Sequence, residues 1–429
     1  MKQKTSLIIG VAVILAVAIA LVTKSGGRQI VHERIDGTNA VLKPGACRAD
    51  LKKYSVDFYM ENSASMDGYV NGRTNFKDVL GMMMVSAKGL CRSVGFNFVN
   101  DAVYKIDESP LGFIQNMDAA KMKVGNVGST DINLIFRSLL RGLRKNHVAV
   151  LFSDCIYSVK NVTGELDNAK NATTDAFLDA ISANKELATV VLQMKSQFSG
   201  IYYDRNDAPL AYSGVRPYYV VMMGDKAALK ALCDGMKLAQ MPGMLHRCCF
   251  STDSWTLDDA TACTIISDYT NARRIKTSKN TIDIDEIRVD KTEPKLRFAV
   301  GIDVSGLLVD KAYVTDAANY EVSPSDYKVL QVIPASEAAK SDFGSTAGAP
   351  YAVQMEVPVG HFASTVTLAL RNRIPAWVKK ANVRDDAGFV PPQGQSFAIE
   401  QMVEGIFNAY DIADRRIFKL ELNIKKYKE

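Results

Sequence analysis

Three short segments in the first half of the chain carry side chains that could ligate a hard metal ion. The ligand candidates share hydroxyl or carboxylate oxygens, and they are Glu61, Ser63, Ser65, Thr130 and Asp154. Oxygen ligands without His or Cys suit Mg²⁺ or another divalent cation of that type. The three hydroxyls could bind the ion directly, and the two carboxylates could supply negative charge, directly or through water. We therefore predict a divalent-cation site.

Two neighbouring residues are expected to support these ligands without binding the ion themselves. Asp131 directly follows Thr130, and Ser153 directly precedes Asp154. A Mg²⁺ ion takes six oxygens, so one coordination position could stay open for an acidic group from another protein. We therefore predict that the bound ion links two proteins and does not catalyse a reaction.

The ligand segments follow or flank strands that the sequence predicts. Residues 54–60 read as a short apolar strand that ends just before Glu61, and residues 148–152 read as a fully apolar strand that ends just before Ser153. A continuously apolar strand is typical of a parallel sheet covered on both faces. In open α/β sheets, ligands bind outside the carboxyl ends of the strands. We therefore expect the segments to meet at one sheet edge, with the Thr130 loop folded over it.

The rest of the first 250 residues continues this alternation of strands and helices. Apolar residues at helical spacing predict helices, which are placed at residues 75–91, 131–143, 174–184 and 225–236. Further strands are predicted at residues 95–100, 103–106, 188–194 and 217–223, the first two as a possible hairpin. This order predicts a doubly wound α/β domain with helices on both faces of the sheet.

The three ligand segments resemble those of von Willebrand factor A (VWA) domains. Residues 61–65, Glu-Asn-Ser-Ala-Ser, resemble the DxSxS motif of that family. Residues 128–131 resemble its threonine loop, and Ser153-Asp154 resembles its Ser-Asp-Gly turn. The resemblance covers about residues 50–245. It implies a Rossmann-like fold with a metal-ion-dependent adhesion site (MIDAS) that captures an acidic group of a protein partner.

Two positions depart from the family pattern. Glu61 stands where the family has Asp, and its carboxylate is one methylene further from the backbone. Cys155 stands where Gly is usual, which removes conformational freedom from the turn. The alternative to a working site is a VWA scaffold whose site has decayed or is only structural.

The N-terminal segment predicts a membrane anchor. Residues 5–23 are uncharged and almost continuously apolar, which is just long enough to span a hydrocarbon core of about 30 Å. We predict a signal anchor over residues 1–24, and the alternative is a signal peptide cleaved after Ala18-Ile19-Ala20. The two lysines ahead of the helix favour a body outside the cytosol, periplasmic or at the cell surface in a bacterium.

Beyond residue 280 the hydrophobic pattern changes its period. Residues 296–304, 351–357 and 366–370 alternate apolar and polar side chains, which predicts half-buried strands of an antiparallel β-sandwich. A helix after Ser396 and a half-buried strand at residues 418–424 close the chain. The expected parts are the anchor, a linker at 25–49, a VWA-like domain at 50–250, a connecting segment at 251–280, the sandwich at 281–385, and a helix and strand at 386–429.

Composition and charge argue against other classes of function. The chain of 429 residues has a net charge of +5 without a dense basic run, so nucleic-acid binding is not expected. The seven cysteines form no CxxC pair. The only tight group that could bind zinc is His246 with Cys248 and Cys249, and adjacent cysteines rarely ligate one metal.

The sequence therefore predicts a membrane-anchored, metal-dependent protein-binding module that serves adhesion or scaffolding. One alternative is a structural component of an envelope or secretion assembly whose sandwich makes the contacts. Another is a metal-assisted hydrolase, which the lack of a convincing general base near the acidic segments disfavours. We expect no enzymatic activity.

Overall fold

A computed structural model describes most of the chain after residue 48. The described residues are 49–128, 131–157, 162–252, 263–265, 272–278, 281–287, 295–304, 307–338, 348–358, 361, 363, 365–410 and 416–424. The predicted anchor at residues 5–23 lies outside this part. Among the described residues, no helix is both long enough and apolar enough to cross a membrane.

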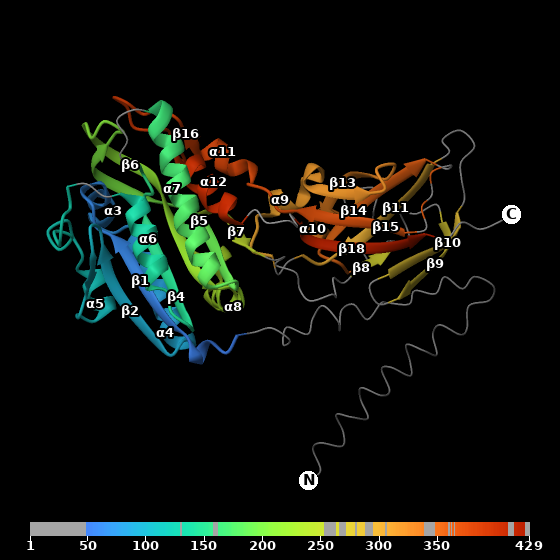
Figure 1. Cartoon of the computed structure of the whole chain (residues 1–429), viewed down its shortest axis with the longest axis horizontal. Coiled ribbons are helices and arrows are strands. Elements are labelled where there is room, and N and C mark those ends of the chain that lie inside the picture. Colours follow the sequence, from blue (N-terminus) through green and yellow to red (C-terminus); the bar gives the residue numbers. More distant parts are fainter. Residues whose placement is uncertain are drawn as a thin grey trace, which may run out of the picture.

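A seven-stranded mixed sheet forms the centre of the first unit (Figure 1). Its strands lie in the order β3-β2-β1-β4-β6-β5-β7. Their bounds are β1 (Ser55–Glu61), β2 (Ser93–Val99), β3 (Val103–Lys105), β4 (His147–Ser153), β5 (Leu187–Tyr203), β6 (Pro209–Asp225) and β7 (Met244–Ser251). β1 runs parallel to β2 and β4, whereas all other neighbouring pairs are antiparallel.

Helices cover both faces of this sheet, as the alternating pattern predicted. One face carries α4 (Asn75–Leu90), α5 (Pro110–Gln115) and α8 (Lys226–Met236). The other carries α6 (Ile132–Gly142), α7 (Val162–Ala183), α11 (Ala376–Ala381) and α12 (Ile399–Tyr410). The period of two along β4 explains the two layers, because Val148 and Val150 face the first set while Ala149 and Leu151 face the second.

The sheet differs from the predicted doubly wound arrangement in β5 and β6. The predicted strands at 188–194 and 217–223 are the inner parts of a long antiparallel hairpin of two 17-residue strands. β6 also runs antiparallel to β4, so the sheet is mixed where the prediction was parallel. The outer half of the hairpin extends past the neighbouring strands, and exposed residues alternate with buried ones there. The continuous apolar run in the sequence ends before that half begins.

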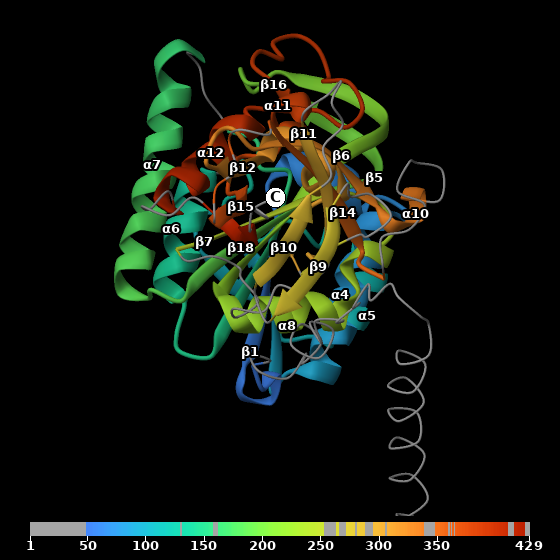
Figure 2. The same ribbon diagram turned by 90° about the vertical axis from the view of Figure 1, so that its right-hand side faces the viewer.

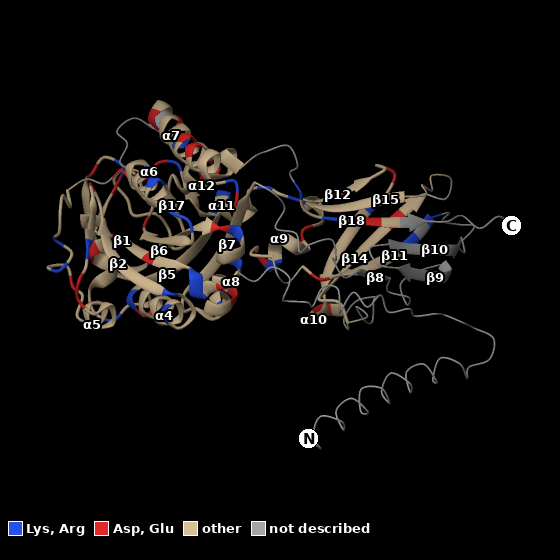
Figure 3. Ribbon diagram, turned by 60° about the horizontal axis from the view of Figure 1, so that its bottom comes forward, with Lys and Arg blue, Asp and Glu red and all other residues tan. Residues whose placement is uncertain are grey.

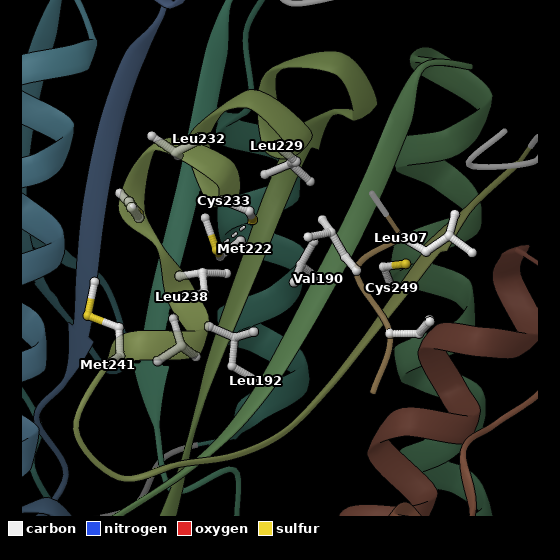
Figure 4. Close-up of a cluster of buried hydrophobic side chains, with 14 of the residues drawn as sticks. Val190, Leu192, Met222, Leu229, Leu232, Cys233, Leu238, Met241, Cys249 and Leu307 are labelled. Carbon is white, nitrogen blue, oxygen red and sulfur yellow. Dashed lines mark hydrogen bonds between the residues drawn. The ribbon is translucent and has the colours of Figure 1, made fainter. Parts of the chain in front are cut away.

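Short helical turns complete the first unit. They are η1 (Leu51–Lys53), η2 (Ala64–Met66), α3 (Asp67–Val70) and η3 (Leu238–Gln240). Figure 4 shows α8 and the segment that follows it over the strand face, with Met222, Val190 and Leu192 beneath Leu229 and Leu238.

Two smaller sheets build the second unit, seen from its end in Figure 2. The five-stranded sheet has the order β12-β15-β18-β10-β9, and the four-stranded sheet has the order β13-β14-β11-β8. The strands are β8 (Cys263–Ile265), β9 (Ala272–Ser278), β10 (Thr281–Ile287), β11 (Lys295–Ile302), β12 (Tyr320–Ser323), β13 (Lys328–Pro334), β14 (Tyr351–Pro358), β15 (Thr365–Arg371) and β18 (Arg416–Ile424). Short helices join them, namely α9 (Lys311–Thr315), η5 (Ala317–Asn319) and α10 (Ala335–Ala338).

The inward side chains of the two sheets share one apolar core. Val300 of β11 and Val353 of β14 belong to the same buried cluster as Leu368 of β15 and Leu420 of β18. The period-two stretches of the sequence are therefore strands, as predicted. β11 and β14 differ from the half-buried strands that were expected, because Ala299 and Ala352 on their other face are buried too. Neighbouring strands are antiparallel except for β10 and β18, which run parallel.

The chain returns to the first unit between β15 and β18. These two strands pair in the second unit, yet α11, β16 (Asn382–Val383), β17 (Ser396–Phe397) and α12 lie between them in sequence. α12 lies beside α7 in Figure 1, and the Thr174 hydroxyl donates to the Gly405 carbonyl at 3.0 Å. Residues 376–385 were predicted to belong to the sandwich, and residues 386–429 to a C-terminal segment. That prediction is wrong for α11 and α12, because both helices pack in the core of the first unit.

We call residues 49–252 and 376–410 the α/β unit, and the described residues of 263–371 and 416–424 the β unit. His246 of β7 marks the junction: its Nδ1 lies 2.7 Å from Asp310 Oδ2, and its ring stacks on Trp377. Cys248 and Cys249 point into the cores on opposite faces of the sheet, and Leu307 of the β unit lies beside Cys249 in Figure 4. These three residues therefore do not converge on a common metal position. Acidic and basic residues are interspersed over both units (Figure 3).

Candidate metal-binding site

The two predicted acidic ligands lie at the same edge of the seven-stranded sheet. Glu61 is the last residue of β1, and Asp154 directly follows β4. β1 and β4 are parallel neighbours, with Met60 opposite Phe152. Their carboxyl ends therefore lie side by side, which is where ligands bind in α/β sheets. The structure thus brings Glu61 and Asp154 together from positions far apart in sequence.

Serine hydroxyls connect the two carboxylates. The Ser63 hydroxyl donates to Glu61 Oε1 at 2.7 Å and lies 3.0 Å from the Ser65 hydroxyl. The Ser65 hydroxyl in turn acts on Asp154, whose pKa it lowers. On the other side, the Ser153 hydroxyl donates to Glu61 Oε2. Glu61, Ser63, Ser65 and Ser153 thus form one continuous hydrogen-bonded network.

The backbone holds Ser153 in its supporting position. The Ser153 hydroxyl accepts a hydrogen bond from the backbone N–H of Cys155 at 2.8 Å while it donates to Glu61. Cys155 has a φ of 55°, which is the left-handed conformation that glycine adopts most easily. The turn therefore has a backbone shape that favours Gly, and here a buried cysteine adopts it.

Both carboxyl groups are buried, and burial disfavours their charged forms. Glu61 is 5% exposed and Asp154 is 4% exposed. Burial, followed by the negative charge of Asp154, raises the pKa of Glu61 to about 8, against the opposing hydrogen bonds from Ser153 and Ser63. Burial likewise raises the pKa of Asp154, and the hydrogen bond from Ser65 opposes that shift.

The donor chemistry of this edge fits a hard divalent cation. In the described part, neither Glu61 nor Asp154 makes an ion pair with a Lys, Arg or His side chain within 4.0 Å. Two buried carboxyl groups without a cation in contact, bridged by hydroxyls, would gain from a divalent ion between them. No group of three or more His, Cys, Asp or Glu side chains that could hold a metal occurs among the described residues. A site here would rely on hydroxyls for its other ligands.

The loop that leads to Thr130 approaches the same edge. Thr130 itself lies outside the described residues. The Val127 carbonyl accepts from the backbone N–H of Ala64 at 3.0 Å, directly beside Ser63 and Ser65. The Asn62 amide donates to the carbonyls of Met122 and Val124. The loop is therefore held over the Glu61 segment up to three residues before Thr130.

Asp131 caps the helix that follows the loop. Its Oδ1 accepts from the backbone N–H of Asn133 at 2.8 Å, at the start of α6. An N-cap carboxylate satisfies a free amide of the first helical turn and stabilises the helix by about 1 kcal/mol. Asp131, which directly follows the predicted ligand Thr130 in sequence, thus stabilises the start of α6.

A buried arginine beside the site was not predicted from the sequence. Arg216 of β6 is 1% exposed, and its positive charge opposes the raised pKa of Asp154. It lies near two other buried polar side chains, Tyr69 and Tyr202. A charged residue directly before the predicted strand at 217–223 was the only available signal, and a charge at a strand end usually faces solvent.

Comparisons with known proteins do not identify a family for this chain. No protein-family model matches the chain, and no curated protein matches it. The VWA resemblance therefore rests on the three segments quoted above, and the mixed sheet with helices on both faces is compatible with a Rossmann-like domain.

Proposed function

We propose that this chain is a membrane-anchored protein-binding module that uses a divalent cation, with Mg²⁺ the best match, in a VWA-type domain. The observation that carries the proposal is the meeting of Glu61 and Asp154 at one edge of the sheet, where the hydroxyls of Ser63 and Ser153 donate to Glu61. In this proposal the β unit is a sandwich that presents the module, and residues 5–23 anchor it with its body outside the cytosol.

Each residue would have a distinct task in holding the ion. Ser63, Ser65 and Thr130 would offer hydroxyl oxygens, and Glu61 and Asp154 would balance the charge. Ser153 fixes the orientation of the longer Glu61 side chain through its hydrogen bond. When bound, the cation supplies one coordination position to an acidic side chain of the partner.

The placement of the histidines favours binding over hydrolysis. His147 lies 2.8 Å from Asp57 near the amino end of β4, the opposite end from Asp154. His246 pairs with Asp310 at the junction, and His361 pairs with Asp326 in the β unit. None of these three is placed to act as a general base at the candidate site.

Partner capture with the full-length protein in nanodiscs tests the proposal. We expect proteins captured from a membrane extract in Mg²⁺ to be released by EDTA and not to bind the double variant Glu61→Gln with Asp154→Asn. Asp107→Asn is the matched control, because Asp107 is an exposed acid paired with Lys105. Capture that survives both EDTA and the double variant would contradict the metal-dependent role and favour an assembly component whose β unit makes the contacts.

A further inference from the structure

The outer half of the hairpin of β5 and β6 has a strand edge that no other strand of the sheet covers. β6 pairs with β5 over its whole length, from Pro209 to Asp225. Its other neighbour, β4, reaches only as far as Ser153, which lies opposite Tyr219. Among the strands that the structure describes, residues 209–218 of β6 therefore have β5 on one side and no strand on the other (Figure 1).

The hydrogen bonds at the two ends of the hairpin show which residues use the uncovered side. In an antiparallel pair, residues that bond to the partner strand alternate with residues that point away from it. The Asp204 N–H donates to the Ala208 carbonyl at 3.1 Å, and the Lys226 N–H donates to the Glu186 carbonyl at 2.9 Å. Both pairs continue the unbroken register of the hairpin. The even-numbered residues of β6 therefore bond to β5, and the odd-numbered ones direct their N–H and C=O groups to the other side.

Two side-chain contacts agree with this alternation. The Tyr69 hydroxyl donates to the carbonyl of Pro217, an odd-numbered residue of β6. On the opposite edge of the hairpin, the Asn71 amide donates at 2.6 Å to the carbonyl of Ser199, an odd-numbered residue of β5. The outer edge of β5 is thus partly covered at Ser199, and the outer edge of β6 is closed at Pro217.

The uncovered part of β6 lies between two prolines. Pro209 and Pro217 both occupy outward positions, where a missing N–H removes no bond to β5. The outward residues between them are Ala211, Ser213 and Val215, which we call the open edge. Within the described chain, their backbone N–H and C=O groups have no hydrogen-bond partner. Ala211 and Ser213 are also exposed to solvent.

Residues 385–396, which connect β16 to β17, lie against the same hairpin without using the open edge. The Tyr202 hydroxyl donates to Asp386, and Arg216 Nη1 donates to the Pro391 carbonyl at 3.2 Å. Every hydrogen bond between these two described segments involves a side chain, and none involves the open edge. The return excursion therefore leaves the backbone groups of the open edge available.

We propose that the open edge binds an extended segment of the protein partner, which adds a strand to the sheet. Its donors and acceptors repeat every second residue, about 6.7 Å apart, and this spacing matches the backbone of another extended chain. The added strand would lie where β4 would run if it continued past Ser153. This inference rests on the proposed function, because the segment belongs to the partner that the module captures.

The position of the open edge also relates it to the candidate metal site. Val215 is four residues along β6 from Tyr219, which corresponds to about 13 Å, and Tyr219 lies opposite Ser153. Asp154 directly follows Ser153. A partner chain that continues past Val215 in the direction of the strand approaches this carboxylate. The partner would therefore combine an extended stretch with an acidic residue beyond one end of it.

Selection of peptides tests the proposal without knowledge of the partner. A library of random peptides displayed on phage is selected against the full-length protein in nanodiscs with Mg²⁺, and the enriched peptides are synthesised. Ser213→Pro removes one outward N–H, so it should weaken their binding at least about fivefold. On the natural chain, bound peptide should slow hydrogen exchange at Ala211, Ser213 and Val215, a result that needs no substitution.

Two variants are matched controls. Ser213→Ala removes the hydroxyl but keeps the N–H, so it should bind the peptides within about twofold of the natural chain. Ile201→Pro places a proline at an outward position of β5, on the opposite edge of the hairpin, and should also leave binding unchanged. Urea unfolding of all three variants shows whether each proline is accommodated in the fold.

The outcomes separate strand addition from metal dependence. Failure to enrich any peptide, or unchanged exchange at the open edge when peptide is bound, overturns the inference. Binding that EDTA abolishes but Ser213→Pro leaves intact also overturns it and leaves the proposed function standing. Binding that requires the open edge but survives both EDTA and the double variant Glu61→Gln with Asp154→Asn supports strand addition and contradicts the metal-dependent role.

Discussion

The two ends of the β1–β4 strand pair use carboxylates in opposite ways. Near the amino ends, Asp57 of β1 lies 2.8 Å from the His147 ring, so an acid meets a group that can carry positive charge. At the carboxyl ends, Glu61 meets a second acid, Asp154, and both are buried. The first arrangement stabilises a fold. The second opposes folding at neutral pH, as the proposed ligand site would.

The largest expected effect of this difference is on the pH dependence of stability. The pKa of Glu61, about 8 in the folded protein, lies above its ordinary value of 4.5. The folded state therefore binds more protons between these two pH values, and its stability falls as pH rises through them. Glu61→Gln should remove this fall and stabilise the metal-free protein at pH 9 by up to roughly 5 kcal/mol. Urea unfolding at pH 6 and pH 9 measures it.

A matched variant at the other end keeps this test specific. Asp57→Asn should leave the fall between pH 6 and pH 9 in place, because Asp57 does not touch the acidic pair. If the natural chain shows no loss of stability over this interval, Glu61 is not the buried acid that the structure indicates.

Ser153→Ala should have the next largest effect. The Ser153 hydroxyl donates to Glu61 and favours its charged form, and hydrogen bonds to charged groups contribute about 1.5–3 kcal/mol. Its loss should raise the pKa of Glu61 further and weaken Mg²⁺ binding at pH 7 by about tenfold or more. Calorimetry measures the affinity, with Ser55→Ala at the amino end of β1 as control. Equal affinities for the two variants would show that Ser153 does not support the site.

The affinity for Mg²⁺ should itself depend on pH. A cation binds the ionised carboxylate. The pKa of Glu61 is about 8 in the folded protein, so Glu61 holds a proton when the pH is lower than that. The affinity should therefore rise by up to about tenfold per pH unit between pH 6 and pH 7.5 and level off above pH 8. Titrations at several pH values check this. A flat profile would show that Glu61 does not take part.

The smallest effect is expected at the amino end. The Asp57 side chain is about one-third exposed, and exposed ion pairs contribute about 0–1 kcal/mol. Asp57→Asn should therefore lower the free energy of unfolding at pH 6 by less than about 1 kcal/mol in urea unfolding. A loss of several kcal/mol would mean that this end is as critical as the other, and the contrast between them would fail.

The sequence predicted the elements whose signals are local. β1, β4, α4, α6 and α8 lie close to their predicted positions, because continuous apolar runs and helical spacing are read within a few residues. The placement of Glu61 and Asp154 at one edge followed from the same rule about strand ends. The Thr130 ligand and the membrane anchor stay predictions, since both lie outside the described residues.

The features that the sequence analysis missed depend on contacts between distant segments. The hairpin of β5 and β6 extends past the sheet, so its outer half lacks the continuous apolar pattern of its inner half. The return of α12 to α7 depends on the close contact at Gly405, where an added Cβ would lie 2.7 Å from Thr173 Cβ. If the two units followed one another along the chain, deleting residues 280–429 would isolate the first unit. Because α11 and α12 pack in that unit, the deletion also removes both helices from its core.

Calorimetric titration of Mg²⁺ into the full-length protein at pH 7.5 tests the central claim most directly. The natural chain should bind with saturation at a single site, and the double variant Glu61→Gln with Asp154→Asn should give no binding heat, whereas Asp57→Asn should bind as the natural chain does. Equal binding by the double variant, or no binding by the natural chain, would contradict a metal site at the carboxyl ends of β1 and β4.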